Sequence, residues 1–318
     1  MPSREEITYF GAGPALLPQD VLETASQALL NFQDTGLGIA EHSHRSALAT
    51  KIIDEAKADL ATYLDIPEDY EIIFMQGGGS GEFSAVVYNL VGAWVARKRR
   101  ALFAKLKNIP DESTWKLSKD AALVYHCSNE TVDGVEFQEF PKSLAPGADG
   151  EGPIVVADMS SNILSRRIPT IAKNNSLYNT LSIFEFGAAI MLTQPSVYIA
   201  GQVLKKLLNT YPNRVEGQEQ VSAKKAELVY GALDAHPDVY KVVPRKNVRS
   251  RMNVCFRASK GGDVDETEKK FLSEATALGL TGLKGHRSVG GVRASLYNSI
   301  PLEGAEKLAK FIDDFAKA

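Results

Sequence analysis

Apolar residues follow two patterns along this chain, short continuous runs and helical spacing, and these patterns predict its elements. The apolar run Ile72–Met75 has the length of a buried strand. The glycine-rich stretch Gln76–Gly81 cannot continue that strand and predicts a turn. From Glu82 onward apolar residues recur at helical spacing, namely Phe83, Val86, Val87, Leu90, Val91 and Trp94. The pattern therefore predicts a strand, a glycine turn and a helix.

The glycine turn is a candidate anion site. Such a turn presents backbone N–H groups at the positive end of a helix, where they can hold a phosphate. Its glycines would also let the backbone approach a ligand without a Cβ in the way. The spacing fits neither G-x-G-x-x-G nor a Walker loop, so a tight turn without a ligand remains an equal alternative.

The rest of the chain alternates helical and strand patterns. Helices are expected at Val21–Phe32, 46–64, Val197–Leu208, Val221–Leu233, Asp265–Leu278 and Leu302–Ala316. Strands are expected at Ala121–Cys127, Pro153–Ala157, Lys241–Val243 and Met252–Arg257. The order favours an α/β domain followed by an α+β domain. We place the domain change near residue 205, which gives domains 1–205 and 206–318.

Three predicted strands end in polar clusters, which are Gln76–Ser80, Asn129–Thr131 and Asp158–Ser161. Ligands of open α/β sheets gather beyond the carboxyl ends of the strands, so we expect one site built from several turns. Asp158 could accept a hydrogen bond from a protonated ring nitrogen, bind a metal ion or cap a helix. The residues alone leave these three readings open.

Two loops contain arginines that could hold an anion. The stretch 282–298 combines several glycines with His286, Arg287 and Arg293, and an arginine fork can hold a phosphate through two hydrogen bonds. Arg45 follows His42 and His44, which lack a third metal ligand nearby, so anion capture by Arg45 is preferred to a metal site. Surface arginines without a ligand are the alternative in both loops.

Composition narrows the classes of partner. The chain has 318 residues, of which 44% are hydrophobic and 24% charged, and its net charge of −3 suggests neither a nucleic acid nor a membrane surface as partner. The start MPSREEITYF lacks the apolar core of a signal peptide, and no apolar run would span a bilayer. We therefore expect a cytoplasmic protein. Cys127 and Cys255 give neither a disulfide framework nor metal-ligand spacing.

Seven segments resemble the phosphoserine aminotransferases, class V members of the fold-type I pyridoxal 5'-phosphate (PLP) enzymes. They are FGAGPALLP, EHSHRS (41–46), MQGGGSGEFSAV (75–86), SNETVDGVEF (128–137), ADMSSNILSR (157–166), NNSLYNT (174–180) and GHRSVGGVRASLYN (285–298). The resemblance implies a mainly parallel sheet flanked by helices and a smaller α+β C-terminal domain. It also implies amino transfer between L-glutamate and 3-phosphohydroxypyruvate in serine biosynthesis, by a homodimer with its active sites at the subunit interface.

The resemblance implies cofactor-binding roles for Gly79, Ser80, Thr131, Asp158, Asn179 and Thr180. Thr131 matches the residue that bonds the ring oxygen. Asp158 matches the acid that faces the pyridine nitrogen and keeps it protonated, so that the ring can accept electrons. The other four match residues that hold the cofactor phosphate, and Asn179 and Thr180 reach it from the partner subunit.

Four further matches concern the substrate. Arg45, His286 and Arg287 match groups that handle the substrate phosphate, and Arg293 matches the residue that grips the α-carboxylate. Two anionic ends on one small substrate would explain why a nearly neutral chain places arginines there.

The chain departs from the family at three places. The family's Schiff-base lysine stands between the segments that match ADMSSNILSR and NNSLYNT, but here only residues 167–173 lie between them, and Lys173 aligns outside the cofactor position. A second gap follows Arg100, where the family has a tryptophan that stacks on the cofactor, and an apolar insertion occupies Phe186–Ser196. We interpret these changes as altered splicing or an altered gene model. The alternative to an active enzyme is therefore a catalytically dead variant that binds phosphate ligands or pairs with a full-length subunit.

Overall fold

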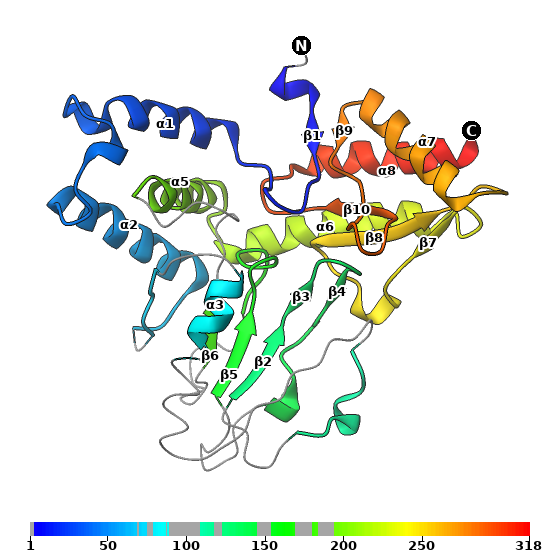
Figure 1. Cartoon of the computed structure of the whole chain (residues 1–318), viewed down its shortest axis with the longest axis horizontal. Coiled ribbons are helices and arrows are strands. Elements are labelled where there is room, and N and C mark those ends of the chain that lie inside the picture. The colour runs from blue at the N-terminus through cyan, green and yellow to red at the C-terminus, as the bar shows by residue number, and fades with distance from the viewer. Residues whose placement is uncertain are drawn as a thin grey trace.

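The computed structural model describes residues 3–68, 70–74, 79–86, 88, 109–117, 123–144, 154–168, 180–183 and 194–318. Figure 1 shows three groups of elements: helices α1, α2 and α5 on one side, strands β2, β5 and β6 below, and a sheet with helices α6, α7 and α8 on the other side. The first two groups come mainly from the first two hundred residues, and the third comes from the C-terminal part.

Helices α1 (Gln19–Leu30), α2 (Ala47–Leu64) and α5 (Gln194–Thr210) form the first group. Ser46 caps α2 through its side chain, which accepts a hydrogen bond from the backbone N–H of Ala49. The helix predicted over 46–64 is confirmed, and Ile52, Ala56, Leu60 and Leu64 form its buried apolar face. They pack partly against Val197 and Leu204 of α5, so that burial of this face holds the two helices together.

A parallel sheet in the order β2–β5–β6 forms the second group. Its strands are β2 (Leu123–Cys127), β5 (Ile154–Asp158) and β6 (Thr180–Ile183). Val155 and Val156 of the central strand are buried, as a strand covered on both faces requires. The strands predicted at Ala121–Cys127 and Pro153–Ala157 are thus confirmed over their described residues, and the parallel pairing brings Cys127 opposite Asp158 at the carboxyl ends.

The predicted strand Ile72–Met75 is wrong over the residues that the structure describes, because 71–74 form no strand. A strand requires partners for its N–H and C=O groups, and in the described part of the chain β2, β5 and β6 pair only with one another. Ile73 is 64% exposed, whereas Ile72 and Phe74 are half-buried and pack against apolar clusters. Residues 75–78 lie outside the described residues. Helix α3 (Gly79–Val86) begins three residues before the predicted Glu82.

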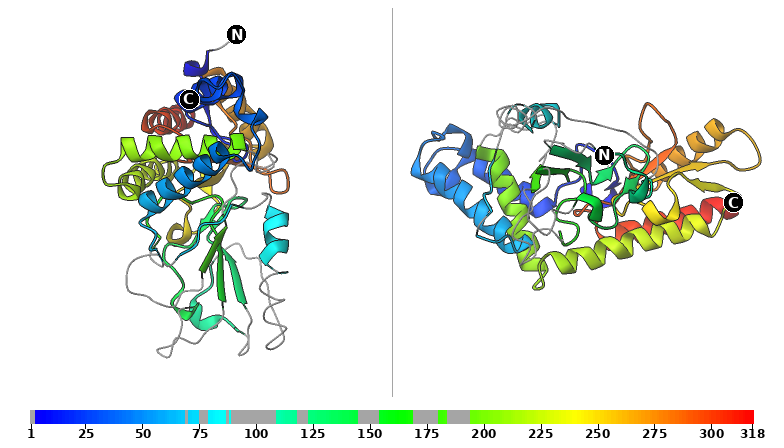
Figure 2. Two further views of the ribbon diagram at one scale, coloured as in Figure 1. Left: turned by 90° about the vertical axis from the view of Figure 1, so that its left-hand side faces the viewer. Right: turned by 90° about the horizontal axis from the view of Figure 1, so that it is seen from below.

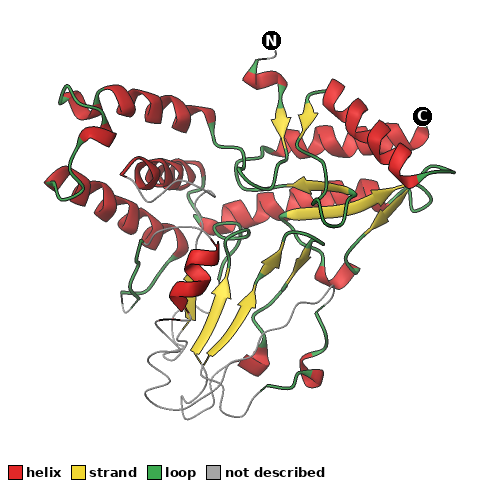
Figure 3. Ribbon diagram, viewed as in Figure 1, coloured by secondary structure: helices red, strands yellow, loops and turns green. Residues whose placement is uncertain are grey.

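The C-terminal part builds an antiparallel sheet in the order β10–β8–β7, which Figure 3 shows apart from the parallel strands. The strands are β7 (Tyr240–Val242), β8 (Asn253–Ala258) and β10 (Val292–Ser295), and the helices are α6 (Val215–Asp234), α7 (Val264–Ala277) and α8 (Leu302–Lys317). Helices α6 and α8 run side by side (Figure 2). Phe271 of α7 contacts the rings of Phe311 and Phe315 of α8, so apolar burial unites this layer.

The N-terminal segment joins the C-terminal part. Strand β1 (Thr8–Tyr9) pairs in parallel with β9 (Leu280–Thr281), and Phe10 is buried in the same apolar cluster as α6 and α8. Residue 205 lies inside α5, which runs on to Thr210. The division into domains 1–205 and 206–318 therefore stays a prediction.

Candidate active site

The carboxyl ends of β2 and β5 place Asp158 among neutral hydrogen-bond donors. Its Oδ2 accepts from the hydroxyl of Tyr125 at 2.8 Å, and its Oδ1 accepts from the backbone N–H and the hydroxyl of Ser160 at 3.0 and 2.8 Å. Asp158 thus caps a turn; none of the described residues that follow it up to 168 is helical. Within the described ranges its half-buried carboxylate forms no ion pair. This site can therefore accept a cationic group.

The environment of Asp158 changes the pKa of its neighbours. Burial and the hydrogen bond to this carboxylate raise the pKa of Tyr125, so its hydroxyl stays protonated and remains a donor. Burial lowers the pKa of His126 to about 4, although the charge of Asp158 acts in the opposite direction. His126 is therefore neutral at physiological pH, and its Nδ1 has no hydrogen-bond partner among the residues that the structure describes.

Thr131 and Arg293 lie together. Strands β3 (Asn129–Glu130) and β4 (Val135–Glu136) frame a turn that contains Thr131, and Arg293 on β10 donates from Nη1 to the Thr131 carbonyl at 2.9 Å. The turn closes with Gly134 at φ +77°, where a Cβ would stand 2.4 Å from the carbonyl oxygen of Asn253. Glycine is required because β8 approaches so closely.

A buried side-chain network joins this turn to the C-terminal sheet. Asn129 donates from Nδ2 to Ser161 Oγ and to Asn253 Oδ1, both at 2.8 Å, and accepts at Oδ1 from Ser250. Asn253 in turn donates to Ser295 Oγ at 3.1 Å. The sequence analysis placed Asn129 and Ser161 in the polar clusters at strand ends. It did not predict a role for Ser250, Asn253 or Ser295, because their partners lie far away along the chain.

The loop between β9 and β10 carries His286 and Arg287. Ser288 approaches His286 Nδ1 through its hydroxyl at 2.6 Å and its backbone N–H at 3.2 Å, which orients the imidazole. Arg287 is exposed, and so is Arg45 in the turn before α2. In the described part of the chain neither guanidinium has an ion-pair partner. The start of α2 lies across the molecule from β10, so one chain does not bring Arg45 to Arg293 (Figure 1).

The remaining predicted cofactor residues are described only in part. Gly79 and Ser80 begin α3, so their backbone stands at a helix N-terminus, as the anion site requires. Thr180 opens β6 opposite Val155. Asn179 lies outside the described residues, as does Lys173. The roles of these residues stay predictions.

The chain matches a family model described as aminotransferase class-V over residues 7–107. It is 36% identical to the phosphoserine aminotransferases of Saccharomyces cerevisiae and Drosophila melanogaster, with 99% and 98% of this chain and 98% and 99% of those proteins covered. The chain belongs to the phosphoserine aminotransferase family. The alignment to the yeast relative extends over 408 positions, 90 more than the 318 residues of this chain, so the relative has internal segments that this chain lacks.

Solved structures of this family share the fold. The phosphoserine aminotransferase of Bacillus circulans subsp. alkalophilus superimposes with a TM-score of 0.81 at 29% identity, covering 97% of this chain and 98% of that one. A PLP-bound phosphoserine aminotransferase of Trichomonas vaginalis superimposes with a TM-score of 0.79 at 28% identity, covering 95% and 98%. The α/β fold-type I architecture of the PLP aminotransferases is thereby confirmed.

The described residues fit the non-covalent part of a PLP site. The carboxylate of Asp158 lacks a cationic partner among them and suits a protonated ring nitrogen, and the start of α3 suits a phosphate. No described lysine bonds to Asp158 or Thr131. Nor do three metal-ligating side chains gather within the described ranges. None of the helices described there has the length and apolar character needed to cross a membrane.

Proposed function

We propose that this site serves the phosphoserine aminotransferase reaction, in which an amino group passes between L-glutamate and 3-phosphohydroxypyruvate to give O-phospho-L-serine and 2-oxoglutarate. The observation that carries the proposal is Arg293, a half-buried arginine with no acidic partner among the described residues. The Thr131 carbonyl holds it at the turn that follows β2, the strand paired with β5 and Asp158. A cation in that position suits a carboxylate ligand. Membership of the family supports the choice of reaction.

Each residue of the site has a separate task in this proposal. PLP, when bound, supplies an electron-accepting ring. Asp158 holds the proton on the ring nitrogen, and Tyr125 and Ser160 hold the carboxylate of Asp158 in place. Arg293 binds the α-carboxylate of the substrate. His286 and Arg287 bind the substrate phosphate from the glycine-rich loop.

The wider setting of the proposal is a cytoplasmic homodimer in L-serine biosynthesis. Arg45 precedes α2, whose start lies on the opposite side of the chain from β10 (Figure 1), and it has no ion-pair partner among the described residues. Both observations support an active site at a subunit interface where a second copy supplies this arginine. Asn179 and Thr180 are assigned to the partner's cofactor phosphate in the same way. A net charge of −3 gives no reason to add a nucleic acid or a membrane to the partners.

A second candidate function follows from the internal gaps. Only residues 167–173 stand where the family has its lysine segment, and the yeast relative aligns over 90 more positions than this chain has. A chain without the covalent amine would bind PLP and phosphorylated substrates without turnover. It could still pair with a full-length subunit.

One experiment separates the two functions. The purified chain is incubated with PLP, reduced with borohydride and mapped by peptide mass spectrometry, while glutamate formation from 2-oxoglutarate and O-phospho-L-serine is followed in parallel. An active aminotransferase carries reduced cofactor on one lysine and forms glutamate. A non-catalytic binder retains PLP on gel filtration but shows no modified lysine and no glutamate. A chain that retains neither PLP nor O-phospho-L-serine contradicts both proposals.

A further inference from the structure

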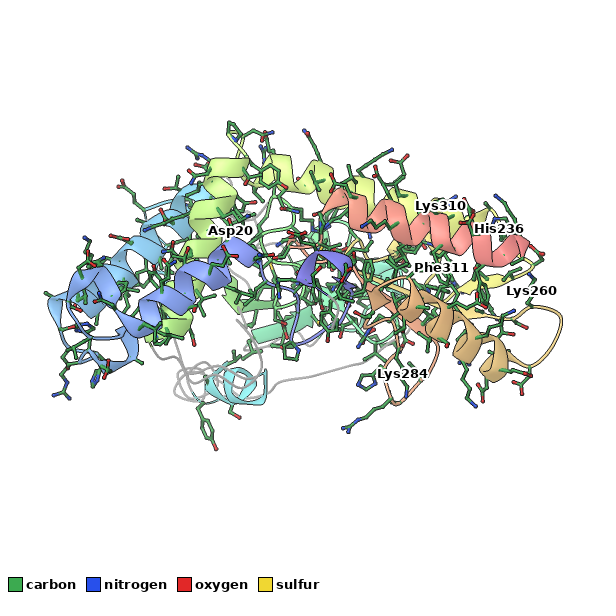
Figure 4. The ribbon with its side chains drawn as sticks, turned by 90° about the horizontal axis from the view of Figure 1, so that it is seen from above. Asp20, His236, Lys260, Lys284, Lys310 and Phe311 are labelled. Carbon is green, nitrogen blue, oxygen red and sulfur yellow. The ribbon has the colours of Figure 1, made fainter. Side chains whose placement is uncertain are left out.

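Arg257, on β8, contacts the loop that carries His286 and Arg287. This loop hangs from β10 under β8 in Figure 1, and Figure 4 labels Lys284 at its beginning. It is closed by its own backbone, because Gly290 N–H donates to the His286 carbonyl and Gly285 N–H to the Gly291 carbonyl, both at 2.9 Å. These bonds fix the turn internally but leave its orientation relative to the sheet to other contacts.

The guanidinium of Arg257 provides such a contact. Arg257 stands on β8, and its Nη1 donates to the Val289 carbonyl at 3.3 Å. Gly291 has φ +78°, and a Cβ there would stand 3.0 Å from Arg257 Cδ and from the Phe256 carbonyl oxygen. The absence of a side chain at Gly291 is therefore what allows the loop to lie on Arg257.

Arg257 is itself held by helix α7. Its Nε donates to Glu268 Oε1 at 2.6 Å, and its Nη2 stands 3.8 Å from Asp265 Oδ1. Glu268 is only 7% exposed and also accepts from the backbone N–H of Ala258, so it is fixed from two sides. A charge-assisted bond to a buried carboxylate leaves the arginine side chain little freedom. The contacts from Glu268 of α7 to Arg257, and from Arg257 to the Val289 carbonyl, therefore fix the position of the loop.

We propose that Arg257 is a positioning residue for substrate-phosphate binding, acting through the loop that carries His286 and Arg287. It does not touch the ligand in this role. The pair Arg257–Glu268 fixes the position of the loop, and the loop in turn fixes the positions of His286 and Arg287. This inference rests on the proposed function for the identity of the ligand, but its structural part concerns the loop alone.

The test compares Arg257→Lys with Arg251→Lys. Lysine keeps the charge but lacks the planar guanidinium, whose separate Nε and Nη1 donors bond Glu268 and the Val289 carbonyl at the same time. Arg251 is a matched control, because its Nη1 also pairs with one glutamate, Glu219, at 3.2 Å, away from the loop. We expect Arg257→Lys to speed amide hydrogen exchange at Gly285, Val289 and Gly290 and to raise the dissociation constant of O-phospho-L-serine about tenfold. Arg251→Lys should change neither.

Two further measurements keep the outcomes distinct. Gly291→Ala places a Cβ 3.0 Å from Arg257 Cδ and from the Phe256 carbonyl oxygen, at a positive φ. It therefore displaces the loop from Arg257 and should weaken O-phospho-L-serine binding in the same way. If the native chain does not bind O-phospho-L-serine, the proposed function fails, while faster loop exchange in Arg257→Lys still supports the positioning role. Unchanged loop exchange in Arg257→Lys overturns the inference, as does an equal effect in Arg251→Lys.

Discussion

Arg293 and Thr131 stand 162 positions apart in the sequence, and the Arg293 guanidinium donates to the Thr131 carbonyl at 2.9 Å. The bond joins the C-terminal sheet to the turn that follows the parallel sheet. It holds an arginine without an acidic partner in the described residues at the turn between β3 and β4, which follows β2, the neighbour of the strand that carries Asp158. An anionic ligand placed there would contact groups from both parts of the chain.

Replacement of Arg293 should affect ligand binding more than stability. Arg293→Lys keeps the positive charge but loses the planar fork, so we expect the dissociation constant of O-phospho-L-serine to rise by about 10- to 100-fold. Isothermal titration calorimetry would measure the change. Arg245→Lys, at an exposed arginine of the same part of the chain, is the control and should leave the constant unchanged.

Asp158 and Tyr125 should differ in their effect on the cofactor. Asp158→Asn removes the charge that stabilises a protonated ring nitrogen, and we expect PLP affinity to fall by about tenfold or more. Tyr125→Phe removes one hydrogen bond to the carboxylate at 2.8 Å and leaves its charge in place, so the loss should be several-fold smaller. Fluorescence titration with PLP would compare the two variants. Equal losses would contradict the role given to Asp158.

The buried hydrogen-bond network of Asn129, Ser161, Ser250, Asn253 and Ser295 should contribute to stability. Asn253→Ala removes the buried acceptor of one Asn129 hydrogen bond and the donor to Ser295 Oγ, so we expect the free energy of unfolding to fall by about 1–3 kcal/mol. Urea unfolding would measure this loss. Asn247→Ala, at an exposed asparagine near the same strand, should change stability by less than about 0.5 kcal/mol.

Lys225 should stabilise the segment that follows β10. Its side chain is fully buried, and its Nζ donates to the carbonyls of Leu296, Tyr297 and Ile300 at 2.9, 2.8 and 2.9 Å. Lys225→Met leaves these carbonyls without the donor, and we expect a loss of about 3 kcal/mol in urea unfolding. Lys224→Met is the matched control, because Lys224 is exposed and pairs only with Glu227 among the described residues. A similar loss in both variants would refute this role.

His126 should make stability depend on pH in the acid range. Burial lowers its pKa in the folded chain to about 4, below the 6.5 of an unfolded histidine, so the unfolded chain binds a proton first as the pH falls. We therefore expect the free energy of unfolding to decrease by up to about 3 kcal/mol between pH 6.5 and 4. In His126→Leu this part of the pH dependence should disappear. An unchanged profile in the variant would contradict the assignment.

The amino-acid sequence by itself determined the elements whose signals are local. The apolar spacing of α2 and the capping Ser46 lie within one stretch of chain, and the same holds for α8, so short-range periodicity located both helices. The polar residues after β2 and β5 pointed to a site at the strand ends, since parallel strands bring these ends together. The strand predicted at Ile72–Met75 was wrong over its described residues, because the apolar character of a run does not show whether a neighbouring strand is present to pair with it.

Only the tertiary structure decided the partners of the site. Asn253 bonds Asn129 across 124 positions, Lys225 bonds the Leu296 carbonyl across 71, and Arg257 reaches the loop through Val289. Such polar residues give no periodic signal, and the same residue types are common on exposed surfaces. Their roles arise because folding buries them, and a buried polar group is stable only with a partner that the local sequence does not specify.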